Sequence, residues 1–192
     1  MDGYEVVCLD NFDMYYNPEI KRKNLAPFLS NPSFSLIEGD ILEEGLLADI
    51  LEDIDYIFHE AAQAGVRVSV GNPRKPHEVN TTGTLNLLEA ALDSDVKKIV
   101  NASSSSVYGK VKYLPFDEDH PNQPTSPYGV SKLAAEHYCR VFSEVYGLKT
   151  VSLRYFTVYG PRMRPDLAIN IFITAALRRQ AISIFGDGSK TR

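Results

Sequence analysis

Short runs of β-branched and apolar residues alternate with longer segments of helical periodicity along almost the whole chain. The runs that predict strands are Tyr4–Asp10, Phe34–Glu38, Asp55–His59, Lys98–Ala102 and Thr150–Tyr155. The segments that predict helices are residues 18–29, 43–53, 76–93, 127–146 and 167–179. Several strand candidates are apolar without strict alternation, as strands of a parallel sheet are when helices cover both faces. This rhythm predicts an α/β fold, a doubly wound parallel sheet.

Composition excludes several classes of protein. The 192 residues are 44% hydrophobic and 23% charged, as in ordinary globular chains. Twenty basic against 25 acidic residues leave a formal charge of -5, which disfavours a nucleic-acid partner. The apolar runs are too short to span a bilayer, and Met1 precedes Asp2 rather than a basic leader, so no membrane partner is expected. Two cysteines cannot form a disulfide framework, so a cytoplasmic location is expected.

The start of the helix predicted over 127–146 carries candidate chemistry. Ser126 suits an N-cap and Pro127 the first helical position. Tyr128 and Lys132 are four residues apart, so they lie one turn apart on one side, and a nearby ammonium lowers the pKa of a phenol. Tyr128 is thus a candidate general base, although a surface tyrosine and lysine would have the same spacing. Further residues at helical spacing predict a buried face: Ala134, Tyr138, Val141, Phe142 and Val145.

Four serines, Ser103 to Ser106, directly follow the strand predicted at Lys98–Ala102. Ligands of a parallel sheet bind outside the carboxyl ends of its strands, where these hydroxyls would meet a sugar or an oxyanion. The alternative is a serine-rich turn. The Pro-rich stretch Pro115–Pro127 is predicted to be a long loop of the kind that often carries function. No metal site is expected, because an H-E-x-x-H pattern beginning at His59 fails at Gln63.

The serine cluster ending in Val107-Tyr108-Gly109, the Pro-rich loop and the sequence SPYGVSK at 126–132 together resemble the extended short-chain dehydrogenase/reductase family. Within it, the match is to the NAD-dependent nucleotide-sugar epimerases and dehydratases, and it covers essentially all 192 residues. The resemblance implies that Tyr128 takes the proton of the sugar 4-hydroxyl while hydride passes from C4 to NAD. It also implies that Lys132 lowers the pKa of Tyr128 and holds the nicotinamide ribose. Ser104 would hydrogen-bond the same hydroxyl.

The same resemblance assigns binding residues in four further motifs, LDN at 9–11, GDI at 39–41, HEAAQ at 59–63 and RYFTVYGP at 154–161. The cofactor NAD would contact Asp10, Asn11, Asp40, Ile41, Ala61, Ala62, Asn80, Tyr128, Lys132 and Tyr155. The UDP-sugar substrate would contact Gln63, Ser105, Ser106, Thr157 and Arg164.

Thr157 and the Arg164-Pro165-Asp166 sequence are similar to the UDP-glucuronate 4-epimerase branch, because hexose epimerases more often carry Asn at the position of Thr157. Hydroxyl donors there would suit a uronate carboxylate, and Arg164 would suit the UDP diphosphate. UDP-glucose 4-epimerases and UDP-glucuronate decarboxylases or dehydratases share most of these motifs and remain alternatives. A non-catalytic, partner-binding Rossmann-like module is an alternative of another class, disfavoured because Ser104, Tyr128 and Lys132 are all present.

Proteins of this family begin with a strand and a G-x-x-G-x-x-G turn that holds the cofactor pyrophosphate, and this sequence has no such turn. The chain is therefore expected to be an inactive fragment. Residues 1–160 would form the NAD-binding domain without its first strand, and residues 161–192 would begin a smaller substrate domain. The missing strand would leave a gap in the middle of the sheet and two unpaired edges.

The resemblance also implies a homodimer, built on a four-helix interface from the helices at 76–93 and 127–146. The apolar residues that indicate it are Leu85, Leu87, Leu88, Leu92, Ala134 and Ala135. Core packing is a comparable explanation for part of that surface.

Overall fold

The computed structural model describes residues 3–184 and 186–188, so residues 1–2, 185 and 189–192 of the two predicted domains lie outside the described residues. Every strand pair is parallel, as predicted. The predicted strands at 34–38 and 98–102 are confirmed residue for residue, whereas the other three are shorter than predicted by one or two residues at an end. The strands are β1 (Val6–Asp10), β2 (Phe34–Glu38), β3 (Tyr56–His59), β4 (Lys98–Ala102) and β5 (Thr150–Leu153).

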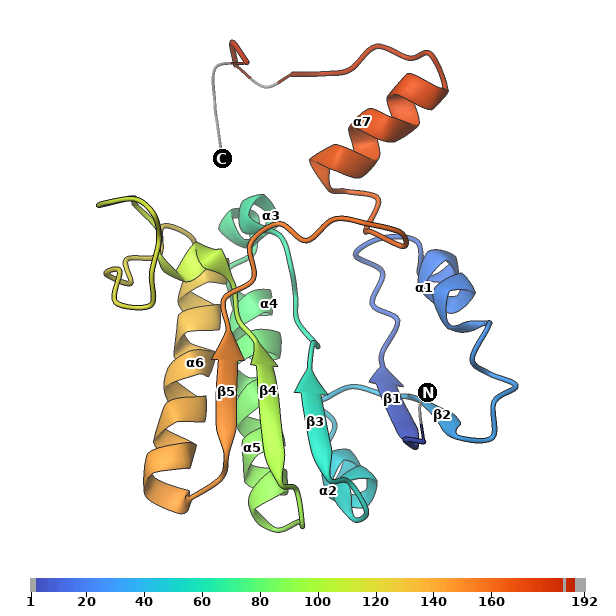
Figure 1. The fold of residues 1–192 in the computed structure, drawn as a ribbon, viewed down its shortest axis with the longest axis vertical. Helices are drawn as coiled ribbons and strands as arrows, with labels where there is room; N and C mark the ends of the chain where they lie inside the picture. Colours follow the sequence, from blue (N-terminus) through green and yellow to red (C-terminus); the bar gives the residue numbers. More distant parts are fainter. Residues whose placement is uncertain (1–2, 185, 189–192) are drawn as a thin grey trace.

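The strands form two separate sheets, β1-β2 and β3-β4-β5, as Figure 1 shows. Across the two sheets the strands follow the order β2-β1-β3-β4-β5, and the hydrogen bonding between the described strands is interrupted between β1 and β3. This is the doubly wound order with a central strand omitted, so the predicted gap between β1 and β3 is confirmed for the described residues. Both strands beside the gap expose apolar side chains: Val7 on β1 is 40% exposed, and Phe58 on β3 is 73% exposed.

Helices occupy most of the predicted positions. The prediction at 127–146 is confirmed at both ends, and the one at 76–93 corresponds to a short α-helix, a π-helix and a longer α-helix in succession. A helix at 66–71 was not predicted. The helices are α1 (Pro18–Leu25), α2 (Leu46–Leu51), α3 (Val66–Gly71), α4 (Arg74–Pro76), π-helix η1 (His77–Thr82), α5 (Gly83–Leu92), 3-10 helix η2 (Ser105–Val107), α6 (Pro127–Tyr146) and α7 (Ala168–Leu177).

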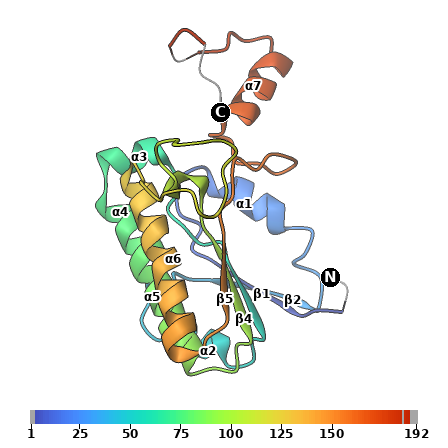
Figure 2. The ribbon, with the colours of Figure 1, turned by 60° about the vertical axis from the view of Figure 1, so that its left-hand side comes forward.

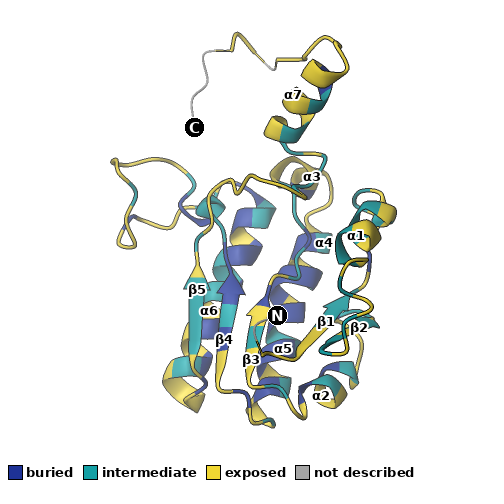
Figure 3. Ribbon diagram, turned by 45° about the vertical axis from the view of Figure 1, so that its right-hand side comes forward, coloured by how far each residue is buried: buried dark blue, intermediate teal, exposed yellow. Residues whose placement is uncertain are grey.

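The core lies between the β3-β4-β5 sheet and the helices α5 and α6, which lie along one face of it in Figure 2. Leu88 of α5, Ile99 of β4 and Cys139 of α6 are almost completely buried there. Figure 3 shows the buried residues concentrated on this contact and α7 largely exposed, standing away from the sheets. The predicted domain boundary at residue 160 stays a prediction.

The predicted buried face of α6 is wrong except at Phe142. Tyr138, Val141 and Val145 are 37%, 40% and 67% exposed, whereas the helix buries its other side. The prediction followed the apolar residues, but the buried side is lined largely by small and polar residues: Gly129, Ser131, Lys132, Ala135, Cys139 and Phe142. Leu87, Leu88 and Ala135 were predicted to indicate the dimer surface. This prediction is wrong for these three residues, because all three are buried in the core.

Candidate active site

The serine cluster forms the first turn after β4 and is held by the chain that leaves β5. Ser103 donates its N–H to the carbonyl of Leu153 at 2.9 Å, and Ser105 donates to that of Tyr155 at 2.8 Å. Ser104, between them, caps η2, its hydroxyl accepting the N–H of Ser106 at 3.2 Å. Ser104 to Ser106 are half-buried, so their hydroxyls lie at the carboxyl end of the sheet, as predicted.

The start of α6 is brought against this turn. Ser126 caps the helix through its side chain, which accepts the N–H of Gly129 at 3.1 Å, and Pro127 is the first helical residue. A Cβ atom at Gly129 would lie 2.7 Å from the carbonyl oxygen of Ser106, so only glycine permits this approach. The N–H of Tyr128 donates to the hydroxyl of the buried Ser69 at 3.2 Å, which joins α6 to α3.

Tyr128 differs from the prediction in its electrostatics. Burial raises the pKa of its phenol, while the Ser104 hydroxyl and the Arg164 charge act to lower that pKa. The prediction that Lys132 lowers this pKa is therefore not confirmed: the net shift is upward, and the groups that oppose burial are Ser104 and Arg164. The structure thus brings Ser104 and Tyr128 together as predicted and adds Arg164 as the cation that acts on the phenol.

Lys132 is 3% exposed, and its ammonium donates to the carbonyl of Ala102, the last residue of β4, at 2.7 Å. Burial lowers the pKa of Lys132 to about 8, and the carboxylate of Glu60 acts in the opposite direction. The side chain thus ties the first turns of α6 to the end of β4. Its position one turn after Tyr128 follows the predicted helical spacing.

Asn80, in the π-helix η1, is 1% exposed, and its side chain is hydrogen-bonded to the segment after β3. Its side-chain oxygen accepts the N–H of Gln63 at 2.7 Å, and its side-chain nitrogen donates to the Gln63 carbonyl and to the Ser131 hydroxyl. Asn80 was predicted to contact the cofactor. That contact stays a prediction; the side chain of Asn80 is hydrogen-bonded within the protein and holds Gln63 and the half-buried Ala61 and Ala62 beside α6.

His59 is a buried residue to which the sequence assigned no role of its own: it was named within the HEAAQ motif and rejected as a metal ligand. It is 4% exposed at the end of β3, and its Nε2 lies 2.8 Å from the hydroxyl of Thr84. That hydroxyl donates to the carbonyl of Asn80, so His59 Nε2 is the donor in the pair. Burial, assisted by the positive charge of Lys132, lowers the pKa of His59 to about 3.

We expect His59 to make the fold acid-sensitive. Between about pH 6.5 and pH 3 the unfolded chain binds a proton at this imidazole that the folded chain does not, so stability falls as the pH drops, by about 1.4 kcal/mol per pH unit. Urea unfolding at several pH values measures this slope. His59→Gln keeps a donor for Thr84 and should flatten it, whereas His137→Gln, at an exposed position of α6, should leave it unchanged. An unchanged slope in His59→Gln would contradict this assignment.

The residues predicted to hold the adenosine end of the cofactor meet at the ends of β1 and β2. Asn11 donates to Asp40 at 2.7 Å, and Asp10 accepts the N–H of Phe12 at 2.7 Å and pairs with Lys21 at 3.6 Å. Ile41 is 8% exposed and belongs to the hydrophobic core, and its carbonyl accepts a hydrogen bond from Asn86 at 3.1 Å. These residues lie across the interrupted sheet from Tyr128 and Lys132.

The residues predicted for the substrate are spread over three segments: Gln63 after β3, Ser105 and Ser106 on η2 after β4, and Thr157 and Arg164 after β5. Thr157 is exposed, and Tyr155, which was predicted for the cofactor, is 39% exposed in the same segment. Arg164 pairs with Asp166 through two nitrogens, at 3.0 and 3.2 Å. The pair also connects to the loop after β1, because Tyr15 donates to Asp166 at 3.1 Å.

Several residues that build the site were missed by sequence reasoning. Ser69 and Ser131 are buried hydroxyls that anchor Tyr128 and Asn80, and Glu136 and Arg154 form an ion pair beside the serine turn. Arg154 was visible in the sequence only as part of a motif. Glu136 lies four residues after Lys132, so its spacing was a signal that could have placed it on the same side of α6.

Two hollows flank these elements. One of about 250 Å³ lies between the loop after β1 and α3 and includes Tyr15, Gln63 and Ser69. The other, of about 420 Å³, runs along α6 and β5 and includes Glu136 and Arg154, but neither Tyr128 nor Lys132. Among the described residues no group of three or more His, Cys, Asp or Glu side chains is arranged to hold a metal ion. No helix in the described part of the chain is long and apolar enough to cross a membrane.

Comparisons with known proteins identify the family of this chain. The model of the NAD dependent epimerase/dehydratase family matches residues 1–192. The chain is 42% identical over 187 residues to UDP-glucuronate 4-epimerase 3 of Arabidopsis thaliana, covering 95% of this chain and 43% of that protein. It is 40% identical over 190 residues to the uncharacterized UDP-glucose epimerase YtcB of Bacillus subtilis, covering 98% and 60%.

A solved structure gives the same result. The crystal structure of UDP-glucuronic acid 4-epimerase from Bacillus cereus, in complex with UDP-glucuronic acid and NAD, matches with a TM-score of 0.92 at 41% identity. The match covers 98% of this chain and 60% of that one. The chain therefore spans less than two thirds of the length of each of these three proteins.

Proposed function

Because this chain belongs to the NAD dependent epimerase/dehydratase family, we propose that it carries the catalytic residues of a C4 epimerase that interconverts UDP-glucuronate and UDP-galacturonate. The observation that carries the proposal is that Ser104, Tyr128 and Lys132 lie together where β4 ends and α6 begins. The names of the Arabidopsis thaliana and Bacillus cereus relatives support the uronate as substrate.

The residues present fit the two riboses of NAD but not its pyrophosphate. Asp10 and the Asn11–Asp40 pair are suited to one ribose, and Lys132 is suited to the other. Between them lies the interruption of the sheet, and the sequence contains no G-x-x-G-x-x-G turn whose backbone amides would hold a pyrophosphate. When bound, NAD supplies a nicotinamide that accepts hydride from C4 and returns it.

In the proposed mechanism, Tyr128 removes the proton of the sugar 4-hydroxyl, and Ser104 donates a hydrogen bond to the same oxygen. Before substrate binds, the same Ser104 hydroxyl stabilises the phenolate form of Tyr128, which burial disfavours; its single O–H donates either to the phenolate or to the sugar oxygen, never to both at once. Lys132 holds a positive charge near this proton path while it is anchored to Ala102. To complete the cycle, Tyr128 would give the proton back to the 4-oxygen of the sugar.

Substrate choice is the finer part of the proposal. Ser105, Ser106 and Thr157 offer hydroxyls for a uronate carboxylate, and Arg164 offers a guanidinium for the diphosphate once it leaves Asp166. UDP-glucose is the second candidate, favoured by the name of the Bacillus subtilis relative. A longer protein that contains this chain should be incubated with each UDP-sugar and the products separated. Faster turnover of UDP-glucuronate is expected; equal or faster turnover of UDP-glucose would overturn the uronate assignment.

Homodimerisation through α6 is also part of the proposal. Five residues at helical spacing form a stripe on α6 beside its buried face. This stripe is here called the α6 stripe: Val130, Ala134, Tyr138, Val141 and Val145. Four of them are at least 37% exposed, so the helix presents an apolar strip next to its buried face.

We expect Val141→Glu, in the middle of the α6 stripe, to convert the dimeric protein to a monomer with little change in stability. The reason is that a charge buried at an interface without a partner costs several kcal/mol, whereas Val141 is 40% exposed in the single chain. Light scattering at micromolar concentration measures the mass. Val111→Glu, at a 56% exposed position a few residues before the Pro-rich loop, is the matched control. A wild-type protein that is monomeric at that concentration would contradict the dimer.

A further inference from the structure

Glu136 of α6 and Arg154, the residue after β5, form a largely buried ion pair. Nη2 and Nε of the guanidinium lie 2.9 and 3.0 Å from the two carboxylate oxygens, and the side chains are only 18% and 11% exposed for Arg154 and Glu136. Such two-point contacts fix direction as well as distance. By contrast, Arg140 and Glu144, which pair within α6, lie 3.8 Å apart, and both of their side chains are 62% exposed.

The position of Glu136 relates the pair to the active site. It lies four residues after Lys132 and eight after Tyr128, on the same side of α6. Its carboxylate also accepts a hydrogen bond from the hydroxyl of Ser103, which is 4% exposed. One carboxylate therefore joins the helix that carries Tyr128 to the residue next to Ser104.

Arg154 relates to Ser104 through the backbone. The carbonyls on either side of Arg154, those of Leu153 and Tyr155, accept the N–H groups on either side of Ser104, those of Ser103 and Ser105. Arg154 and Ser104 thus face each other across this extension of the β4-β5 pairing. Fixing the guanidinium to Glu136 fixes the distance between the turn that carries Ser104 and α6.

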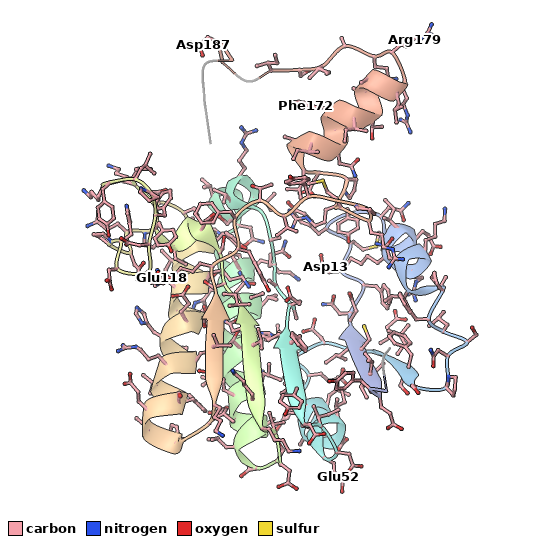
Figure 4. The ribbon with its side chains drawn as sticks, in the orientation of Figure 1. Asp13, Glu52, Glu118, Phe172, Arg179 and Asp187 are labelled. Carbon is pink, nitrogen blue, oxygen red and sulfur yellow. The ribbon has the colours of Figure 1, made fainter. Side chains whose placement is uncertain are left out.

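The guanidinium also holds the Pro-rich loop. Its Nη1 donates to the carbonyl of Glu118 at 3.3 Å, and it lies 4.8 Å from the ring centroid of Tyr108. Figure 4 shows Glu118 where this loop returns toward the N-terminal end of α6. The pair therefore connects three segments that surround the serine turn.

We propose that Glu136 and Arg154 are positioning residues that hold the hydroxyl of Ser104 against the phenol of Tyr128. This rests on the proposed function in that Tyr128 is taken as the base. Neither residue is assigned contact with substrate or cofactor; they act through Ser103, Ser104 and the first turns of α6.

The proposal has a consequence that a purely stabilising ion pair lacks. The Ser104 hydroxyl lowers the pKa of Tyr128, so withdrawal of Ser104 leaves burial less opposed and raises that pKa further. General loosening would instead expose Tyr128 to water, and this lowers the pKa of a buried phenol. The two roles predict opposite shifts.

The test measures phenolate reactivity in the 192-residue chain and needs no turnover. Tetranitromethane attacks the phenolate, so its rate at Tyr128, followed by peptide mapping at mildly alkaline pH, reports the phenolate fraction; Tyr4, 70% exposed, is the internal reference. In Glu136→Gln we expect the rate at Tyr128 to fall by about tenfold for each unit by which its pKa rises. Glu144→Gln, the matched control on the exposed pair, should leave the rate unchanged.

Ser103→Ala and Glu136→Asp extend the test should Glu136→Gln not fold. Ser103→Ala removes only the hydroxyl that joins the carboxylate to the turn, and Glu136→Asp keeps the charge on a shorter side chain; both should slow nitration of Tyr128. An unchanged or faster rate in the folded variants would overturn the positioning role. Because nitration involves no UDP-sugar, a protein that failed to epimerise would refute the proposed function without changing this result.

Discussion

Replacing Tyr128 with phenylalanine is expected to lower kcat of the epimerase by about 10³-fold, the usual range for removal of a general acid-base group. The phenol is the group that the geometry places beside Ser104, and no other described side chain is assigned the proton. The backbone anchor of residue 128 on Ser69 is retained in the variant, so the fold should be unaffected. In the wild type, kcat should rise with pH as the phenolate forms, because burial raises the pKa of the free phenol.

The control is Tyr138→Phe, on the same helix but 37% exposed within the α6 stripe. It should leave kcat within a few-fold of the wild type. Circular dichroism and NAD titration of Tyr128→Phe would establish that the variant is folded and binds its cofactor. Turnover of Tyr128→Phe near the wild-type rate would remove Tyr128 from the mechanism.

The second large effect concerns the chain by itself. We expect the 192-residue chain to bind NAD at least about 100-fold more weakly than a longer protein in which a strand and a glycine-rich turn lie between β1 and β3. The turn would supply several charge-assisted hydrogen bonds to the pyrophosphate, each worth about 1.5–3 kcal/mol. The two ribose sites of the chain lie on separate sheets, so preorganisation is lost as well.

Calorimetric titration of both proteins with NAD measures the difference. The control is Asp10→Asn in the longer protein, which removes one ribose acceptor and should weaken binding far less than loss of the whole turn. Micromolar NAD binding by the 192-residue chain, together with turnover, would show that the interruption between β1 and β3 is not a gap in the cofactor site.

Sequence reasoning located the strands well because parallel strands need continuous apolar runs, which end visibly at residues such as Asp10 and Ala102. It located α6 from Ser126 and Pro127 because caps are local chemistry. It failed on the buried face of that helix, where Lys132 and Ser131 are inside and Val145 is outside. The local pattern predicts that the apolar residues are buried. In the fold Lys132 is buried instead, because it anchors the start of α6, which carries Tyr128, to the end of β4.

The site shows the same division. Ser104, Tyr128 and Lys132 were predicted together because their motifs are short and follow one another in the chain. The upward shift in the pKa of Tyr128 was not predicted, because burial, which raises the pKa, and Arg164, which acts to lower it, depend on segments far away in the sequence. Glu136 and Arg154 are eighteen residues apart on different elements, and their pairing is visible only in the fold.

The central claim, transient oxidation at C4 with return of the same hydride, is tested most directly with UDP-glucuronate that carries deuterium at C4. The longer protein containing this chain should convert it to UDP-galacturonate, and mass spectrometry and proton NMR of the product should find the deuterium still at C4. Tyr128→Phe should give no labelled product on the same time scale. Loss of the deuterium to solvent, or conversion by deprotonation at another carbon, would contradict the account.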